Sequence, residues 1–331
     1  MIEVNNLVKE FKKPIRCEGV IGMLKTLFSA KYEVKRAVND ISFTINDGEI
    51  VGYIGSNGAG KSTSIKMMCG ILTPTSGSVR IDSVEPYKKR RQIASKIGVV
   101  FGQKTQLWWD LPLIESFKIL KEIYGVSDSN YKERMEFLTN TLGINDIMNQ
   151  PVRTLSLGQR MRADLLASWL HNPKILFLDE PTIGLDVLVK DKIREAIKAM
   201  NKKYNTTVIL TTHDMQDIEN LCDRVILIDD GRIIYDGDIH SLKNKFGNIK
   251  TITVTLDNII TIDSLDDFNN TVKYSLEENN LKIKFNPDAI NIERIINYIF
   301  SNYHPKDIKI TSIGIEDIVK EMLKRKENND A

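Results

Sequence analysis

Residues 55–62 read GSNGAGKS, a glycine-rich run that ends in a lysine and a hydroxyl side chain. The run satisfies the pattern G-x-x-x-x-G-K-[ST] without a mismatch. Its glycines let the backbone approach an anion closely, where a Cβ would intervene. The loop amides and the start of a following helix then face a phosphate chain, while Lys61 adds a positive charge and Ser62 offers a hydroxyl to Mg²⁺. These residues predict a site for a nucleoside triphosphate.

Four further polar side chains follow apolar runs downstream of this loop. Asp179 and Glu180 end the run ILFLDE, and a carboxylate at such a strand end suits the shell of a hard cation. His213 ends TTVILTTH, and Gln103 follows IGVVF at 97–101. Taken singly, two adjacent acids are as typical of a solvated turn, and a lone histidine or glutamine is more often structural. Their order along the chain makes them candidates.

The elements that must position these groups alternate between strands and helices. Short apolar or alternating runs predict strands at 2–8, 41–46, 49–56, 97–101, 174–180, 206–213 and 224–237. The all-apolar runs ILFL and VILI suit strands buried on both faces of a mostly parallel sheet. KSTSIKMMCGIL predicts a helix directly after the glycine loop, and helical periodicity dominates from about 112 to 172. The fold class is therefore α/β, with a helical subdomain at about 105–172.

The pattern changes after about residue 242. Strands are expected at 251–256, 281–285 and 308–313, and helices at 291–300 and 315–324. These elements describe a small α+β domain. We therefore expect a first domain at 1–240 and an accessory domain at 241–331.

Composition sets the broad class of protein. The 331 residues suggest two domains, and a net charge of +2 argues against a chain built around a nucleic-acid-binding face. No apolar window is long enough to span a membrane, and the N-terminus does not resemble a secretory signal. The three cysteines, Cys17, Cys69 and Cys222, show no disulfide or zinc spacing, which fits a reducing compartment. A cytoplasmic protein is expected.

Several classes of protein share a phosphate loop, among them GTPases, kinases and motor ATPases. Residues 154–180 indicate which class this chain resembles. They contain LSLGQ, then a helical stretch, then the apolar strand that ends in Asp179 and Glu180. Together with the loop and the motifs around Gln103 and His213, this order resembles the nucleotide-binding domain of ATP-binding cassette (ABC) proteins over roughly residues 1–240. The resemblance implies a P-loop ABC cassette, ATP as substrate, Mg²⁺ as its cation, and ATP hydrolysis.

The resemblance also implies a role for each matching position. Glu180 matches the general base, His213 the switch histidine that contacts the γ-phosphate, and Gln103 the Q-loop glutamine. Mg²⁺ would be held by Ser62, Gln103 and Asp179. Phe11 is the best match to the aromatic ring that stacks on adenine, with Tyr32 as a competitor. The expected ATP-binding residues are Phe11, Gly55, Ser56, Asn57, Gly58, Ala59, Gly60, Lys61, Ser62 and Thr63, of which Lys61 also acts in catalysis.

The LSLGQ segment matches the family signature that closes on ATP held by a second subunit. A helix that starts at Ser156 directs its positive end outward, and Gly158 and Gln159 follow it. Asp186, in the segment GLD, matches the D-loop, which also acts across a dimer. Leu157 stands where the family pattern LSGGQ has a glycine, so the resemblance leaves its effect on turnover open. A head-to-tail dimer, homo- or heteromeric, is implied.

Two features indicate which ABC protein this is. The stretch between Lys61 and Ser156 is too short for the long coiled coil of the chromosome-maintenance and double-strand-break-repair relatives, and one cassette per chain argues against the translation factors. The ATPase subunit of a transporter remains, most like ABC-2-type bacterial exporters in the putative multidrug or viologen branch. Such a subunit works peripherally on the inner membrane face through a separate permease. The alternative is a soluble switch ATPase in DNA repair or translation.

Two segments are not explained by the motifs. Residues 12–36 form an insert with seven Lys and Arg against two Glu, and its apolar stripe at helical spacing suggests docking on the permease or on anionic headgroups. A solvated surface loop explains the insert equally well. Trp108 and Trp109 follow the Q-loop, where the family receives a permease helix, but paired tryptophans are more often core. The accessory domain suggests dimer support or regulation, and a passive extension is as good an explanation.

Overall fold

The computed structural model describes residues 1–14, 32–102, 104–246, 249–256, 271–303, 305–312, 314–320 and 322. The chain forms two compact units, Met1–Gly237 and Asp238–Ala331. Gln103 and the apolar stripe of the insert lie outside the described residues. Within the described ranges, no helix combines the length and the apolar character needed to cross a membrane.

An antiparallel sheet with strand order β2-β1-β4 begins the first unit. Its strands are β1 (Ile2–Pro14), β2 (Tyr32–Ile45) and β4 (Ser76–Ile81). The β1–β2 pairing runs from Ile2 opposite Ile45 to Pro14 opposite Tyr32. Both strands are longer than the runs 2–8 and 41–46 that alternation indicated. The outer part of the hairpin is exposed and rich in lysine, so it carries no hydrophobic pattern.

A six-stranded sheet with the order β5-β6-β7-β3-β8-β9 carries the candidate residues at its edge. Its strands are β3 (Ile50–Gly55), β5 (Ile97–Phe101), β6 (Ile175–Asp179), β7 (Thr207–Thr211), β8 (Arg224–Asp229) and β9 (Arg232–Asp238). The pairs β5–β6, β6–β7, β7–β3 and β3–β8 are parallel. Because parallel strands end at the same edge, the last residues of β3, β6 and β7 lie together there.

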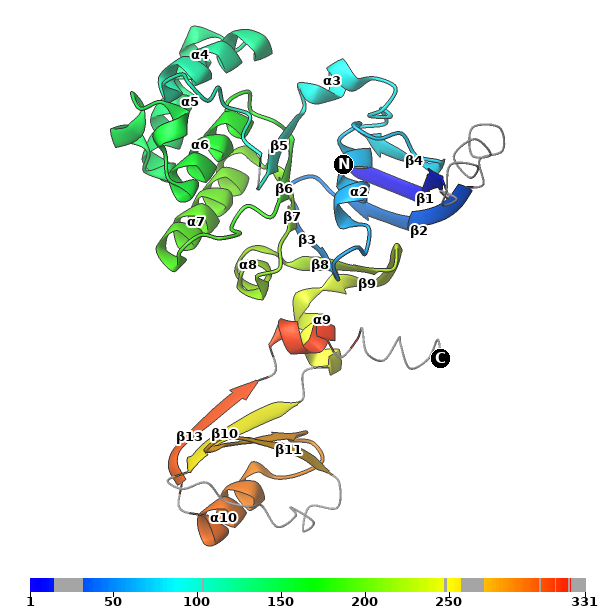
Figure 1. Ribbon diagram of the computed structural model, residues 1–331, viewed down its shortest axis with the longest axis vertical. Coiled ribbons are helices and arrows are strands. Elements are labelled where there is room, and N and C mark those ends of the chain that lie inside the picture. The colour runs from blue at the N-terminus through cyan, green and yellow to red at the C-terminus, as the bar shows by residue number, and fades with distance from the viewer. Residues whose placement is uncertain are drawn as a thin grey trace, which may run out of the picture. The chain divides into compact units, whose positions relative to one another are not determined.

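The helix after the glycine loop is anchored in the core of this unit. This helix, α2 (Lys61–Met68), lies against β2, β3 and β4 (Figure 1). Its residues Ile65, Met67 and Met68 belong to a buried cluster that includes residues of both sheets. Full burial of each such side chain stabilises the fold by about 1.5–3 kcal/mol. The position of the loop relative to both sheets is therefore set by packing. A short helix, α3 (Arg90–Ala94), precedes β5.

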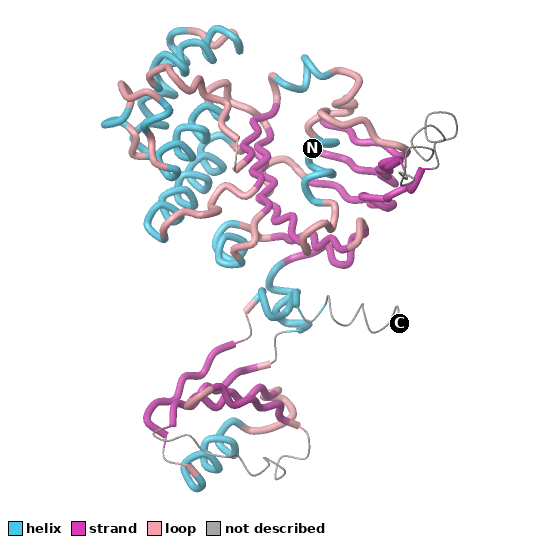
Figure 2. The backbone as a smooth tube through the Cα atoms, viewed as in Figure 1, coloured by secondary structure: helices cyan, strands magenta, loops and turns pink. Residues whose placement is uncertain are grey.

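Helices gather beside the six-stranded sheet, as Figure 2 shows. They are α4 (Leu113–Tyr124), α5 (Asp128–Leu142), α6 (Leu157–Trp169), α7 (Val187–Tyr204) and α8 (Met215–Leu221), with 3₁₀ turns at Asn145–Ile147 and Val152–Thr154. Gly125 and Gly143 end α4 and α5 in the left-handed conformation that stops a helix. The helical stretch expected from about 112 to 172 is thus divided among α4, α5 and α6.

The second unit contains a four-stranded antiparallel sheet with the order β11-β12-β10-β13. Its elements are α9 (Ile239–Phe246), β10 (Lys250–Leu256), β11 (Val272–Glu277), β12 (Asn280–Phe285), α10 (Ile292–Asn302) and β13 (Pro305–Ser312), followed by helical residues 315–320. Ile295 and Ile299 of α10 pack with the sheet in one buried cluster. The sequence analysis missed β11, because this edge strand is mostly exposed and polar.

Candidate functional site

The glycine loop joins β3 to α2 in a conformation that most residues cannot adopt. Gly60 has φ +104°, and a Cβ there would collide with the carbonyl oxygen of Ala37. A Cβ at Gly55 would collide with the carbonyl oxygen of Ile228. The loop backbone therefore packs tightly against β2 and β8, and the absence of a Cβ at these two positions allows that close approach.

Lys61 begins α2 and folds back over the loop. Its Nζ donates to the carbonyl oxygens of Gly55 at 2.7 Å and Ser56 at 3.0 Å. These bonds use two of the three ammonium protons. Burial lowers the pKa of Lys61, and the neighbouring carboxylates Glu180 and Asp179 oppose that change. The side chain thus places its ammonium group over the glycine loop.

The edge of the sheet joins this lysine to two acids. Asp179 ends β6, and its Oδ1 accepts from Thr211 Oγ1 at 2.6 Å. Ser62 Oγ lies 3.5 Å from the same Oδ1. A hydroxyl and a carboxylate this close provide the oxygen donors that Mg²⁺ prefers. Among the described residues, no group of three His, Cys, Asp or Glu side chains is arranged to hold a metal ion.

Glu180 and His213 face each other across the ends of β6 and β7. Glu180 Oε1 lies 3.2 Å from His213 Nε2. The backbone of Glu180 has φ +58°, which is uncommon for a residue other than glycine, and its amide donates to the carbonyl oxygen of Thr211 at 3.0 Å. Burial raises the pKa of the Glu180 carboxyl, while His213 and Lys61 lower it. A raised pKa suits a carboxylate that must accept a proton.

A pocket of about 640 Å³ collects most of these groups. Its lining consists of Phe11, Lys13, Lys35, Ala37, Asn57, Gly58, Gly60, Lys61, Ser62, Thr63, Glu180, Ile183 and His213. Phe11, which is 42% exposed, supplies an aromatic ring at a pocket that also holds three lysines. Tyr32, its competitor, is exposed and is not part of that lining. The volume lies within the range of small-molecule sites.

Three loop positions support the pocket without lining it. Ser56 Oγ donates to Asp229 Oδ1 at 2.8 Å, and Ala59 is buried, with its carbonyl oxygen accepting from the amide of Gly231 at 3.0 Å. Gly55 accepts from Lys61, as described above. The predicted ATP-binding set thus divides into residues that face the pocket and residues that fasten the loop to β8 and the turn after it.

A second pocket of about 430 Å³ adjoins the first and shares Ser62, Glu180 and Ile183 with it. Asp179 also lines this second pocket, as do Gly102 and Lys104, the neighbours of Gln103. The amide of Gly102 donates to the carbonyl oxygen of Asp179 at 2.8 Å. The segment that carries Gln103 is therefore joined to the end of β6.

The signature residues lie at the start of α6. Ser156 caps this helix: its Oγ accepts from the amide of Gln159 at 3.2 Å, and Gln159 Oε1 accepts from the amide of Ser156 at 2.9 Å. Gly158 is buried against Val189 of α7. Leu157 is 38% exposed and lies against Gly184. The helix start is therefore well ordered by its own capping box.

The D-loop residue Asp186 lies beside this turn, at the start of α7. Its Oδ1 accepts from the amide of Val189 at 3.0 Å, and Val189 packs against Gly158. The residues described as lining the two pockets include none from 156–159 and not Asp186. The structure thus separates the sequence-predicted site into a phosphate pocket and a second, exposed surface formed by two helix starts.

Sequence reasoning missed several pocket residues. Lys13 and Lys35 lie on the β1–β2 hairpin, where Lys35 is opposite Phe11. The surplus of basic residues in segment 12–36 was the available signal, but it was attributed to docking. Thr211 was also missed, although its hydroxyl joins Asp179 to the amide of Glu180.

Comparisons with known proteins identify the family of the chain. The family model described as "ABC transporter" matches residues 38–183. The ABC transporter ATP-binding protein NatA of Bacillus subtilis is 36% identical over 215 residues, 65% of this chain and 87% of that protein. The linearmycin resistance ATP-binding protein LnrL of Bacillus subtilis is 30% identical over 291 residues, covering 86% and 91%.

Solved structures share the fold of the cassette. The protein cbiO1 from Clostridium perfringens, part of the ABC transporter complex cbiONQ, has a TM-score of 0.60 at 26% identity, covering 74% of this chain and 90% of that one. The dimeric ATP-binding cassette MJ0796 bound to ADP and Pi also has a TM-score of 0.60, at 24% identity, covering 72% and 99%.

The chain belongs to the family of ABC transporter ATP-binding proteins. It is an ATP-binding, ATP-hydrolysing subunit of a transporter. The alternative of a soluble switch ATPase in DNA repair or translation is not supported.

Proposed function

We propose that the pocket over the glycine loop holds the triphosphate of MgATP and that its residues carry out hydrolysis. The observation that carries this proposal is the convergence of Lys61, Ser62, Glu180 and His213 on one pocket. Lys61 and the loop amides would neutralise the β- and γ-phosphates, and Lys13 and Lys35 add positive charge nearby. Phe11 would stack on the adenine ring, because a flat aromatic face favours such contact.

We assign the Mg²⁺ position to Ser62 and Asp179. Their oxygens lie 3.5 Å apart, at the boundary between the two pockets. Gln103 is the third proposed ligand and lies outside the described residues. Bound there, Mg²⁺ would supply charge neutralisation to the phosphates.

Glu180 is the proposed general base. It accepts a proton from a water molecule that attacks the γ-phosphorus, while the bond from that phosphorus to the β–γ bridging oxygen breaks. The products are ADP and inorganic phosphate, to which the proton returns. His213, 3.2 Å from Glu180, would donate to the γ-phosphate or orient the base.

The signature turn serves a second copy of the chain in this proposal. Ser156 and Gly158 start a helix whose positive end faces outward, so the turn suits a phosphate that its own subunit does not hold. Two chains would close head to tail around two ATP molecules, with Asp186 of each at the junction. Hydrolysis removes the linking phosphates, and the dimer reopens.

We further propose that the partner is an ABC-2-type permease and that the complex exports its substrate. The similarity to a protein named for linearmycin resistance favours export. Trp108 and Trp109 are 38% and 49% exposed, and Arg160 lies 5.6 Å from the Trp109 ring centroid, so an aromatic surface is available to a permease helix. The chain would then act in the cytoplasm, at the inner face of the membrane.

The test is Glu180→Gln in the full chain, assayed for ATP turnover and for dimerisation by size-exclusion chromatography. The amide keeps the shape of the side chain but cannot take the proton. We expect turnover to fall on the order of a hundredfold or more, with an ATP-dependent dimer that persists. Glu136→Gln, at an exposed position on α5, is the matched control and should behave as the wild type. Normal hydrolysis by Glu180→Gln would overturn the assignment of the base.

A further inference from the structure

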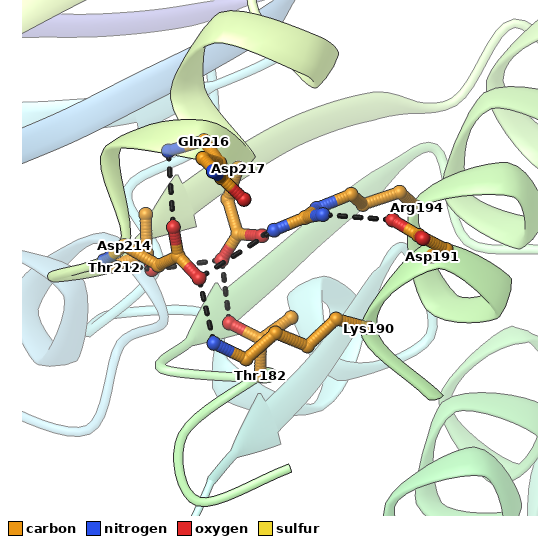
Figure 3. Close-up of polar contacts among 8 residues, drawn as sticks. All are labelled: Thr182, Lys190, Asp191, Arg194, Thr212, Asp214, Gln216 and Asp217. Carbon is orange, nitrogen blue, oxygen red and sulfur yellow. Dashed lines mark hydrogen bonds and ion pairs between the residues drawn. The ribbon is translucent and has the colours of Figure 1, made fainter. Parts of the chain in front are cut away.

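A largely buried polar network adjoins the segments that carry the proposed catalytic groups Glu180 and His213, and no sequence motif assigns it a role. It consists of Thr182, Lys190, Arg194, Thr212, Asp214 and Asp217, drawn with their neighbours in Figure 3. Asp217 is fully buried on α8, and Arg194 of α7 is 7% exposed at its side chain. We propose that Asp217 is a positioning residue that sets the separation of Glu180 and His213. This inference rests on the proposed function of those two groups.

The carboxylate of Asp217 has partners on both of its oxygens. Its Oδ1 accepts from Arg194 Nε at 2.7 Å and lies 2.6 Å from Arg194 Nη2 in the same ion pair. Its Oδ2 accepts from Thr182 Oγ1 at 2.5 Å and from Thr212 Oγ1 at 2.9 Å. A carboxylate offers about four lone-pair sites, so both its position and its plane are fixed.

Its two hydroxyl donors flank the proposed catalytic pair. Thr182 lies two residues after Glu180, and Thr212 directly precedes His213. One carboxylate therefore joins the segment after β6 to the segment after β7 (Figure 3). A shift of either hydroxyl would lengthen a hydrogen bond to a buried charge, which is costly.

The backbone of Glu180 adds a reason for such an anchor. Its φ of +58° is a strained conformation that persists only where the surroundings hold it. Thr211 holds the residue on one side, through its carbonyl and hydroxyl oxygens. The bond from Thr182 to Asp217 holds the chain on the other side. The strained residue is thus held from the end of β7 on one side and from α8 on the other.

The network also reaches the helix that follows the D-loop. Lys190 and Arg194 are one turn apart on α7, and they lie 2.6 Å and 3.5 Å from Asp214 Oδ2. Asp214 adjoins His213 and donates its amide to Thr212 Oγ1 at 2.9 Å. The helix α7 begins at its cap residue Asp186, in the proposed dimer contact. Lys190 and Arg194 therefore connect the helix that carries this contact to Asp214, the neighbour of His213.

A buried ion pair is not required for stability alone. Apolar residues of similar volume are often as stabilising, because desolvation of the charges offsets their attraction. What the charged arrangement supplies is a fixed orientation for two hydroxyls. This reasoning predicts a defect in the chemical step rather than in ATP binding.

The experiment compares Thr182→Val with wild type in the full chain, measuring kcat and KM for ATP together with the thermal midpoint. Valine keeps the side-chain volume and removes one bond to Asp217. We expect kcat to fall by about tenfold or more, as for one lost hydrogen bond to a charged group, with KM within about twofold. Thr182→Ser keeps the hydroxyl and should restore kcat.

Thr139→Val is the matched control for loss of a buried threonine hydroxyl. Thr139 is buried on α5, and its Oγ1 donates to the carbonyl oxygen of Met135 at 2.7 Å, away from the site. This variant should lose some stability while keeping kcat. Placed in the Glu180→Gln background, Thr182→Val should still form the ATP-dependent dimer, because the nucleotide and signature surfaces are untouched.

Three results would overturn the inference: an unchanged kcat in Thr182→Val, a kcat loss equal to that of Thr139→Val, or no recovery in Thr182→Ser. Loss of the ATP-dependent dimer in the double variant would equally contradict a role confined to the chemical step. A wild-type chain without ATPase activity would instead contradict the proposed function. The two failures are therefore distinguishable.

Discussion

Asp164 offers a quantitative test of the structure through pH. It lies on α6 and is 4% exposed, and its Oδ1 accepts from Thr105 Oγ1 at 2.9 Å and from the amide of Gln106 at 3.0 Å. Burial raises the pKa of Asp164 to about 6 from 3.8, although those two bonds and Arg160 act in the opposite direction. The carboxyl of Asp164 therefore holds Thr105 and Gln106 in the segment after Gln103. Its burial opposes its ionisation.

The sign of the effect on stability follows from proton binding. Between pH 3.8 and about 6 the folded chain retains a proton on Asp164 that the unfolded chain has lost. The free energy of unfolding therefore falls as pH rises through that window. At about 1.4 kcal/mol for each pH unit, the shift corresponds to a loss of about 3 kcal/mol, complete above pH 6.

Asp164→Asn removes this pH-dependent contribution to the free energy of unfolding, because an amide does not titrate. The amide oxygen can still accept both hydrogen bonds. The stability of the variant relative to wild type should rise by up to about 3 kcal/mol between pH 4 and pH 7. The new amide protons change the free energy of unfolding by an amount that is independent of pH, so the predicted change with pH is unaffected.

Urea unfolding followed by tryptophan fluorescence is the assay, since Trp108, Trp109 and Trp169 all lie in the first unit. Asp146→Asn, at an exposed position in the same helical region, is the control. If the difference in the free energy of unfolding between Asp164→Asn and wild type stays constant from pH 4 to pH 7, burial does not raise the pKa of Asp164 and the reasoning is refuted.

Two further predictions concern nucleotide binding and closure. Phe11→Ala should raise KM for ATP by about two- to tenfold, the range of an aromatic stacking contact, while Phe11→Tyr should leave KM unchanged. Steady-state assays measure both values. Equal KM values for the wild type and the two variants would exclude stacking. Leu157→Gly should strengthen ATP-dependent dimerisation in the Glu180→Gln background, on the order of tenfold or about 1.4 kcal/mol, because it removes an exposed apolar side chain from the helix start that faces the phosphate. Weaker dimerisation, measured by light scattering, would show that the contact of Leu157 with Gly184 matters more.

Much of the cassette could be predicted because its signals are local. The glycine loop needs only eight consecutive residues to specify its ligand, and the apolar runs of β6, β7 and β8 report burial on both faces. The signature was also a local signal, since the five residues LSLGQ carry it, and the structure adds a capping box between Ser156 and Gln159 within one helical turn.

The elements that were missed carry weak local patterns. The outer half of the β1–β2 hairpin is exposed, so nothing in its composition indicated a strand or placed Lys35 opposite Phe11. Edge strand β11 was missed for the same reason. Hydrophobic periodicity reports burial, and these strands are ordered by pairing with a neighbour instead.

The sequence by itself predicted a phosphate-binding loop, the order of the signature groups along the chain, and the mostly parallel sheet that the all-apolar runs form. Tertiary structure decided which polar groups meet. Thr182 and Asp217 are 35 positions apart, and Thr105 and Asp164 are 59 apart, yet each pair forms a hydrogen bond to a buried carboxylate. A buried carboxylate must find its donors wherever packing brings them, so its partners are set by the fold as a whole and leave no pattern in the neighbouring residues.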